Sequence, residues 1–109
     1  MTLDSAGTAG PSPVETLGAA LAGCMTSDLV FILTRGRHSL RAVRAQLTAE
    51  RAQDDPRRLL RVALHLTVEG DAPPEAIERA IALSREKYCS VWHSMRQDID
   101  FRVTFDALA

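Results

Sequence analysis

GPSPVETLGAALAGC, residues 10–24, is the segment that decides the fold. Ser12 can accept a hydrogen bond at the start of a helix, and Pro13 suits the first helical position. Glu15 follows Ser12 at the spacing of a capping box. Apolar residues then continue on nearly every face for about twenty residues. The segment therefore predicts a long, largely buried helix that carries a thiol, Cys24, near its middle.

Alternation of apolar and polar residues predicts three strands after this helix. Residues 43–49 and 60–68 both show a period of two and are separated by a turn, so we expect them to form an antiparallel pair. An amphipathic helix is expected from Pro73, and a short helical piece follows it. Residues 99–105 alternate again as a final strand. The chain is therefore expected to be an α+β domain in which a long central helix packs on an antiparallel sheet.

The predicted elements leave the long helix incompletely covered. Two main helices and three strands are too few to bury an element that is apolar on nearly every face. We therefore expect a second subunit to complete the fold.

The composition is that of one ordinary domain. The chain has 109 residues, of which 46% are hydrophobic and 25% charged. Residues 1–10 are expected to form a flexible tail, and residues 11–109 the domain. The net charge of -1 gives no field that would attract nucleic acid or an anionic membrane. The longest apolar run, residues 29–33, is too short to span a bilayer, and no signal-peptide pattern precedes it, so we expect a cytoplasmic protein. Its two cysteines are then expected to be free thiols or a redox pair and not a structural disulfide.

The two cysteines are the candidate reactive residues. Free cysteine often packs as a small buried hydrophobe, and from the residues alone this is the favoured interpretation of Cys24. Asp28 follows one helical turn later, and its charge would raise the pKa of the thiol unless a cation offsets it. Cys89 lies at a helix junction, where Ser90 can cap the next helix. A spacing of 65 residues leaves open whether the two thiols meet.

Other candidate chemistry has less support. Glu15 lies two and a half turns before Cys24 on the opposite face of a straight helix, so capping is its favoured role and a site role across a subunit interface is the alternative. The three histidines share no ligand spacing with one another or with the cysteines, so we expect no metal site. Lys87 is the single lysine, which leaves little amine chemistry, and no bound cofactor is expected.

Three segments together resemble the OsmC/Ohr family of thiol-dependent hydroperoxide reductases, and in particular its OsmC-like branch. They are GPSPVETLGAALAGC with the following Asp28, TAERAQDDP between the predicted strands, and LSREKYCSV around Cys89. The resemblance implies an intertwined homodimer with active sites at the interface, each long helix being buried against the partner. Because the PSP segment begins at residue 11, the chain is expected to lack the family's N-terminal strands and the active-site arginine that they supply.

The resemblance also implies a reaction. Cys24 would be the peroxidatic thiol, which forms a sulfenic acid, and Cys89 the resolving thiol, which condenses with it to a disulfide. Organic hydroperoxides would be the substrates, and an external dithiol reductant would restore the thiols. Glu15 stands one place further from the proline than the corresponding family glutamate, which weakens its implied site role. The alternative is a non-catalytic structural or small-molecule-binding dimer whose cysteines serve only in packing.

Overall fold

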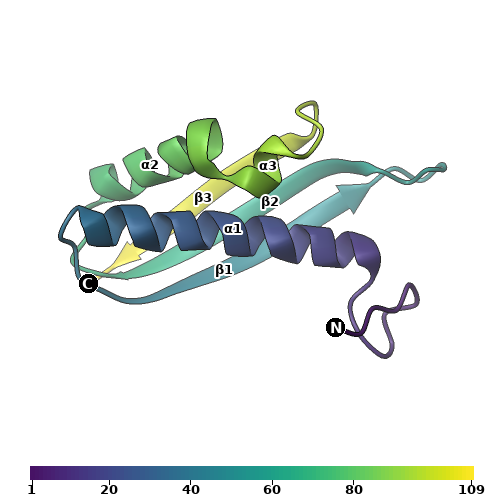
Figure 1. Ribbon diagram of the computed structural model, residues 1–109, viewed down its shortest axis with the longest axis horizontal. Coiled ribbons are helices and arrows are strands. Elements are labelled where there is room, and N and C mark those ends of the chain that lie inside the picture. The colour runs from purple at the N-terminus through teal and green to yellow at the C-terminus, as the bar shows by residue number, and fades with distance from the viewer.

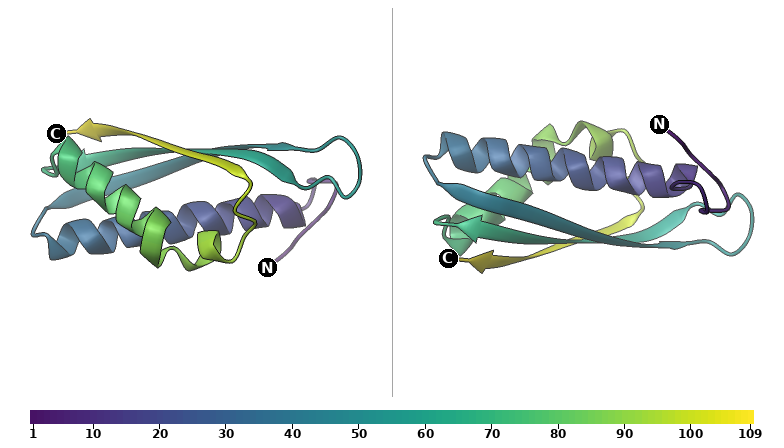
Figure 2. Two further views of the ribbon diagram at one scale, coloured as in Figure 1. Left: turned by 90° about the horizontal axis from the view of Figure 1, so that it is seen from above. Right: turned by 90° about the horizontal axis from the view of Figure 1, so that it is seen from below.

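The helices of the protein cover one face of a three-stranded sheet. In the computed structural model, which describes residues 1–109, the elements are α1 (Pro13–Arg35), β1 (Leu40–Arg51), β2 (Leu59–Gly70), α2 (Pro74–Leu83), the π-helix η1 (Ser84–Tyr88), α3 (Ser90–His93) and β3 (Asp100–Leu108). Figure 1 shows α1 lying along the sheet with α2 and α3 beside it, and Figure 2 shows the helices gathered on one side. The predicted α+β fold is confirmed.

The start of α1 is the predicted capping box. Oγ of Ser12 accepts a hydrogen bond from the Glu15 N–H at 3.1 Å, and the Glu15 carboxylate accepts one from the Ser12 N–H at 2.8 Å. Both bonds satisfy backbone donors that a helix start leaves without partners. The hydrogen bonds from Ser12 hold the pKa of Glu15 below its usual value. Glu15 is thus fully engaged in beginning the helix.

A turn around Asp4 precedes α1. The carboxylate of Asp4 accepts hydrogen bonds from the Thr8 hydroxyl and from the N–H groups of Ala6, Thr8 and Ala9. These donors, led by the Thr8 hydroxyl, lower the pKa of Asp4 well below its usual range. The expected flexibility of residues 1–10 stays a prediction.

The sheet is mixed, with β2 at its centre. β1 pairs with β2 in the predicted antiparallel direction, so that Leu47 lies opposite Leu64. β3 runs parallel to β2, with Val103 opposite Leu64, where a wholly antiparallel sheet was expected. The physical reason is the long crossover through α2, η1 and α3, which returns the chain to the end of the sheet at which β2 begins. Parallel neighbours need a connection of this kind.

The core lies between the sheet and the helices. Its fully or nearly fully buried side chains come from α1, β2, α2, α3 and β3, and the largest are Leu21, Met25, Leu29, Leu33, Val62, Leu64, Leu66, Val68, Ile77, Trp92 and Phe101. The opposite face of the sheet carries ion pairs, among them Arg44 with Glu69 and Arg61 with Glu50. The predicted alternation in β2 therefore separates a core face from a polar face.

α1 buries one face within the chain and leaves the other open. Buried residues recur every four positions from Leu21 to Leu33, whereas Leu17, Val30 and Phe31 are exposed. By length and composition alone this helix is apolar enough to cross a membrane, a test that the core helix of a soluble protein also passes. Leu21, Met25, Leu29 and Leu33 of this helix are buried in the core of the domain. A partner subunit over the open face stays a prediction.

Candidate thiol site

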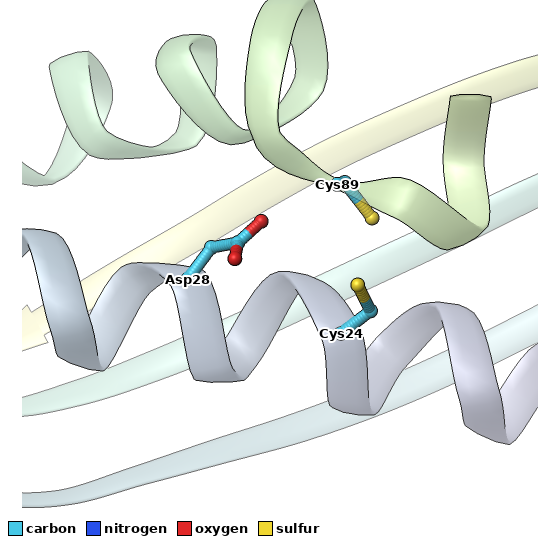
Figure 3. A group of neighbouring side chains, drawn as sticks. All are labelled: Cys24, Asp28 and Cys89. Atoms are coloured by element: carbon cyan, nitrogen blue, oxygen red, sulfur yellow. The ribbon is translucent and has the colours of Figure 1, made fainter.

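The structure brings the two cysteines together although they are far apart in the sequence. Cys24 projects from the middle of α1, and Cys89 stands between η1 and α3. The two sulfur atoms and a carboxylate oxygen of Asp28 all lie within 4.8 Å of one another. Figure 3 shows the two thiols pointing toward each other, with Asp28 one turn further along α1. The contact that the sequence left open is therefore present within a single chain.

The π-turn of η1 positions Cys89. The Cys89 N–H donates a 2.7 Å hydrogen bond to the carbonyl of Ser84, five residues earlier, which widens the last turn of the helix. Cys89 then adopts an extended conformation and its sulfur accepts the N–H of Trp92 at 3.5 Å. Cys89 itself is therefore the N-cap of α3, whereas the sequence suggested Ser90, which is the first residue inside that helix.

Arg85 connects the helices before and after Cys89, η1 and α3, to strand β3. Its guanidinium lies 5.5 Å from the ring centre of Trp92 and 4.9 Å from that of Phe101. The same group donates a 2.6 Å hydrogen bond to the Phe101 carbonyl. Since Arg85 belongs to η1, Trp92 to α3 and Phe101 to β3, one side chain connects the elements on either side of Cys89 to β3.

Hydrogen-bond donors, and no cation, favour the Cys24 thiolate. Partial burial and the charge of Asp28 raise the pKa of Cys24, while the Val91 N–H and the side chains of Cys89 and Ser90 lower it. Oγ of Ser90 lies 3.7 Å from the Cys24 sulfur. The net result is a pKa below the ordinary 9.0. Within a single chain, the donors at the start of α3 thus oppose the effect of Asp28 without a cation, and a cation from a second subunit stays a prediction.

The second thiol has the opposite character. Cys89 is fully buried, and burial, reinforced by Cys24 and Asp28, raises its pKa to about 11. Only the hydrogen bond from the Trp92 N–H acts in the other direction. At neutral pH the pair therefore consists of one thiol that loses its proton more readily than usual and one that keeps it.

Asp28 is fixed by a buried serine. The Ser84 hydroxyl, which is fully buried, donates a 2.8 Å hydrogen bond to Oδ2 of Asp28. The sequence identified Asp28 as a neighbour of Cys24, but the hydrogen bond between Asp28 and Ser84 was not predicted. That serine falls on the apolar stripe of the second helix, and a polar residue at a predicted core position was the signal for a buried partner.

Glu15 is not part of the thiol site within one chain. Its nine-residue separation from Cys24 corresponds to about 13 Å along a helix. It lines a different cavity of about 400 Å³, together with Leu47 and Met95 among others. The capping role is the one that the single chain displays.

An apolar cavity adjoins the thiol site on the Asp28 side. It has a volume of about 560 Å³, and its lining residues come from α1, α2 and η1: Asp28, Phe31, Ile32, Arg35, Leu83 and Tyr88. Asp28 thus belongs to both the cavity wall and the thiol cluster. This arrangement places room for an apolar group next to Asp28, although neither cysteine lines the cavity.

Known proteins share this sequence pattern and fold. The family model described as OsmC-like protein matches residues 5–104. Protein YhfA of Escherichia coli K12 is 35% identical over 106 residues, which cover 96% of this chain and 79% of YhfA. The OsmC like protein from Mycoplasma pneumoniae superposes with a TM-score of 0.87 at 15% identity, over 100% of this chain and 82% of that one. The organic hydroperoxide resistance protein OhrB of Bacillus subtilis superposes with a TM-score of 0.63 at 17% identity, over 94% and 75%. These two structures show a common fold.

Proposed function

Because the chain belongs to the OsmC-like protein family, we propose that it is a thiol-dependent peroxidase that reduces organic hydroperoxides through Cys24 and Cys89. The observation that carries the proposal is the facing pair of thiols with pKa values displaced in opposite directions. A nucleophile needs a thiolate, and a resolving thiol need only be close to it. The names of structural neighbours such as OhrB point to the same substrate class.

The first step uses Cys24. Its thiolate attacks one oxygen of the hydroperoxide, an S–O bond forms and the O–O bond breaks. The leaving alkoxide takes up a proton from solvent and departs as an alcohol, and the sulfur becomes a sulfenic acid. The Val91 N–H and the Ser90 hydroxyl stabilise the thiolate before attack, because both lower the pKa of Cys24.

The second step uses Cys89. Its sulfur attacks the sulfenic sulfur of Cys24, an S–S bond forms, and the hydroxyl leaves as water with the Cys89 proton. The sulfur atoms start within 4.8 Å of each other and must approach to about 2 Å. An external dithiol then reduces the disulfide and is itself oxidised, so that two thiols are restored. A cytoplasmic location supplies such reductants.

The cavity beside Asp28 supports an organic substrate. Phe31, Ile32 and Leu83 give it apolar walls, and its volume of about 560 Å³ suits a hydrocarbon group larger than a peroxide alone. The apolar part of an alkyl or aryl hydroperoxide would occupy this space with its O–O group toward Cys24. Hydrogen peroxide gains nothing from such walls and would be the poorer substrate.

A second copy of the chain would complete the molecule. Leu17, Val30 and Phe31 are 40%, 40% and 63% exposed on the open face of α1. A homodimer through this face would bury them and, since Phe31 also lines the cavity, would supply part of the cavity's cover. Sedimentation of the parent and of Phe31→Arg tests this arrangement. The parent should sediment as a dimer and the variant should shift toward monomer, with Thr67→Arg on the polar sheet face as control.

The test of the function is turnover of cumene hydroperoxide with dithiothreitol as reductant. The parent should consume peroxide continuously, and Cys24→Ser should fall to the uncatalysed rate. Cys89→Ser should stop at sulfenic acid and be labelled by dimedone at Cys24, at one label per chain. Asp54→Asn, an exposed change distant from the thiols in sequence, should behave as the parent.

The second candidate is a non-catalytic binding or structural dimer. It is favoured by one observation: Cys89 is fully buried with a raised pKa, the ordinary state of a cysteine that only packs. Absence of peroxide consumption by the folded parent, or equal consumption by parent and Cys24→Ser, would support this candidate and contradict the peroxidase.

A further inference from the structure

The thiol pair and Asp28 form a cluster of three ligating side chains. Asp28 lies four residues after Cys24, on the same face of α1, and Cys89 faces both from the start of α3. Their three ligand atoms lie within 4.8 Å of one another. The spacing of the histidines, on which the expectation of no metal site rested, could not reveal this cluster, because the cysteines are 65 residues apart in the sequence.

We infer that the reduced protein binds one Zn²⁺ ion through Cys24, Asp28 and Cys89, with water as the fourth ligand. Two thiolates and a carboxylate are ligands that Zn²⁺ takes in tetrahedral geometry, and three protein ligands plus water is the pattern of an open zinc site. Mg²⁺ and Ca²⁺ prefer sites made of oxygen ligands only, so the two sulfur atoms select against them.

The positions of the ligand atoms suit the ion. Zinc–sulfur bonds of about 2.3 Å place the two sulfurs of a tetrahedral site about 3.8 Å apart. Ligand atoms that already lie within 4.8 Å of one another reach this geometry through adjustments of the side chains, with α1 and α3 left in place. Binding exchanges the protons of the two thiols for the metal and changes no oxidation state.

Ser84 supplies the outer support that such a site requires. Its hydroxyl donates to Oδ2 of Asp28, which fixes the carboxylate and leaves Oδ1 without a hydrogen-bond donor from the protein. Ligating carboxylates are commonly held by a hydrogen bond of this kind. Ser84 is fully buried and Cys89 is fully buried, so the site is pre-organised on one side by the core and open on the side of Cys24.

One consequence rests on the proposed function. Zn²⁺ would occupy the same sulfur atoms that attack peroxide and form the disulfide, so zinc and peroxide compete for the reduced protein. A disulfide has no thiolate to offer, so the oxidised protein would release the ion. The site would thus couple zinc binding to the redox state of the chain.

Zinc binding is measured without peroxide, so its outcome is independent of the peroxidase. The reduced full-length chain is titrated with ZnCl₂ against a chromophoric chelator, and Co²⁺ is added separately to observe thiolate charge-transfer absorption. We expect one ion per chain, loss of the absorption in Cys24→Ser, and at least tenfold weaker zinc binding in Asp28→Asn and Ser84→Ala. Asp54→Asn should bind as the parent. Circular dichroism verifies that each variant is folded.

Two results would overturn the inference. One is a folded, reduced parent that takes up less than one equivalent of zinc or gives Co²⁺ no thiolate absorption. The other is an Asp28→Asn variant that binds zinc as tightly as the parent, since the carboxylate would then not be a ligand. A parent that binds zinc but consumes no peroxide keeps the site and contradicts only the proposed reaction. A parent that consumes peroxide but binds no zinc contradicts the zinc site and leaves the proposed reaction in place.

Discussion

The hydroxyl of Ser84 in η1 donates a 2.8 Å hydrogen bond to the carboxylate of Asp28 in α1. This bond joins a fully buried serine to the carboxylate that shares a cluster with both thiols. The charge of the carboxylate acts on each thiol in the same direction, since it raises the pKa of Cys24 and of Cys89. Asp28 therefore limits how acidic the nucleophile can become.

Replacement of Asp28 by asparagine should make Cys24 more acidic. Asparagine can still accept the Ser84 hydrogen bond, but it carries no charge that opposes the thiolate. In a Cys89→Ala background, the midpoint of the pH dependence of iodoacetamide alkylation should move to lower pH than in the same background with Asp28. Asp54→Asn serves as the matched control and should leave the midpoint in place. An unchanged or higher midpoint would contradict the assigned effect of Asp28.

Alkylation should distinguish the two cysteines in the parent. Cys24 is partly exposed with a lowered pKa, whereas Cys89 is buried with a pKa of about 11. Limited iodoacetamide at neutral pH should therefore add one label per reduced chain, at Cys24. Peptide mass spectrometry locates the label. Modification of Cys89 first would show that the assignment of nucleophile and resolving thiol is reversed.

The raised pKa of Cys89 should make the protein less stable in alkali. The unfolded chain releases this proton near the ordinary 9.0, while the folded chain keeps it to about 11. Between these values the unfolded state binds fewer protons, so the free energy of unfolding falls as pH rises, and the loss is complete above about pH 11. Its size is about 2 to 3 kcal/mol for a displacement of about two pKa units.

Urea unfolding of the parent and of Cys89→Ala, each across pH 8 to about 11, measures this loss. The difference between the two proteins isolates Cys89 from other groups that titrate in the same range. Parallel curves for the two proteins would show that Cys89 does not keep its proton in the folded state.

The capping box should contribute to stability and not to turnover. Ser12→Ala removes the side chain that accepts the Glu15 N–H and should lower the free energy of unfolding by about 1 kcal/mol. Glu15→Gln keeps an acceptor for the Ser12 N–H and should cost less. Urea unfolding gives the stability and the cumene hydroperoxide assay the activity. A large loss of turnover in folded Glu15→Gln would restore a site role for this residue across a subunit interface.

Arg85 should control how firmly Cys89 is held. Lysine keeps the charge of Arg85 but loses the planar contact with Trp92 and Phe101 and the donor geometry toward the Phe101 carbonyl. We expect Arg85→Lys to lower the free energy of unfolding by about 1 kcal/mol. Disulfide formation after one equivalent of peroxide should also slow, because the segment that carries Cys89 is less fixed. The exposed Arg79→Lys, on α2, should change neither quantity.

Most of the fold follows from local sequence patterns. The capping residues begin α1 at Pro13, and alternation identifies β2 as a strand with one buried face. Alternation identifies a strand but does not give its direction. The expectation of a wholly antiparallel sheet therefore failed for β3, which runs parallel to β2. The long helical connection between β2 and β3 was the available sign of a parallel pair.

The site was predictable only in part. Each cysteine was recognisable as a candidate, but their contact depends on a π-turn, and a single extra residue in a helical turn leaves no periodic trace in so short a segment. The donors that lower the pKa of Cys24 include a backbone N–H, that of Val91, and a backbone group has no signature in the residue types. Tertiary placement, and not composition, decides these features.

Because of the π-turn of η1, the number of residues between Ser84 and Cys89 determines the direction in which Cys89 points around the helix axis as well as its position along that axis. One residue fewer between them would restore an ordinary helical turn and swing everything that follows by about 100° around the axis. The Cys89 sulfur would then leave Cys24, although both cysteines and every charged group would still be present. Exposed residues such as Glu86 and Lys87 can therefore be substituted, whereas the number of residues between Ser84 and Cys89 cannot change without moving the Cys89 sulfur.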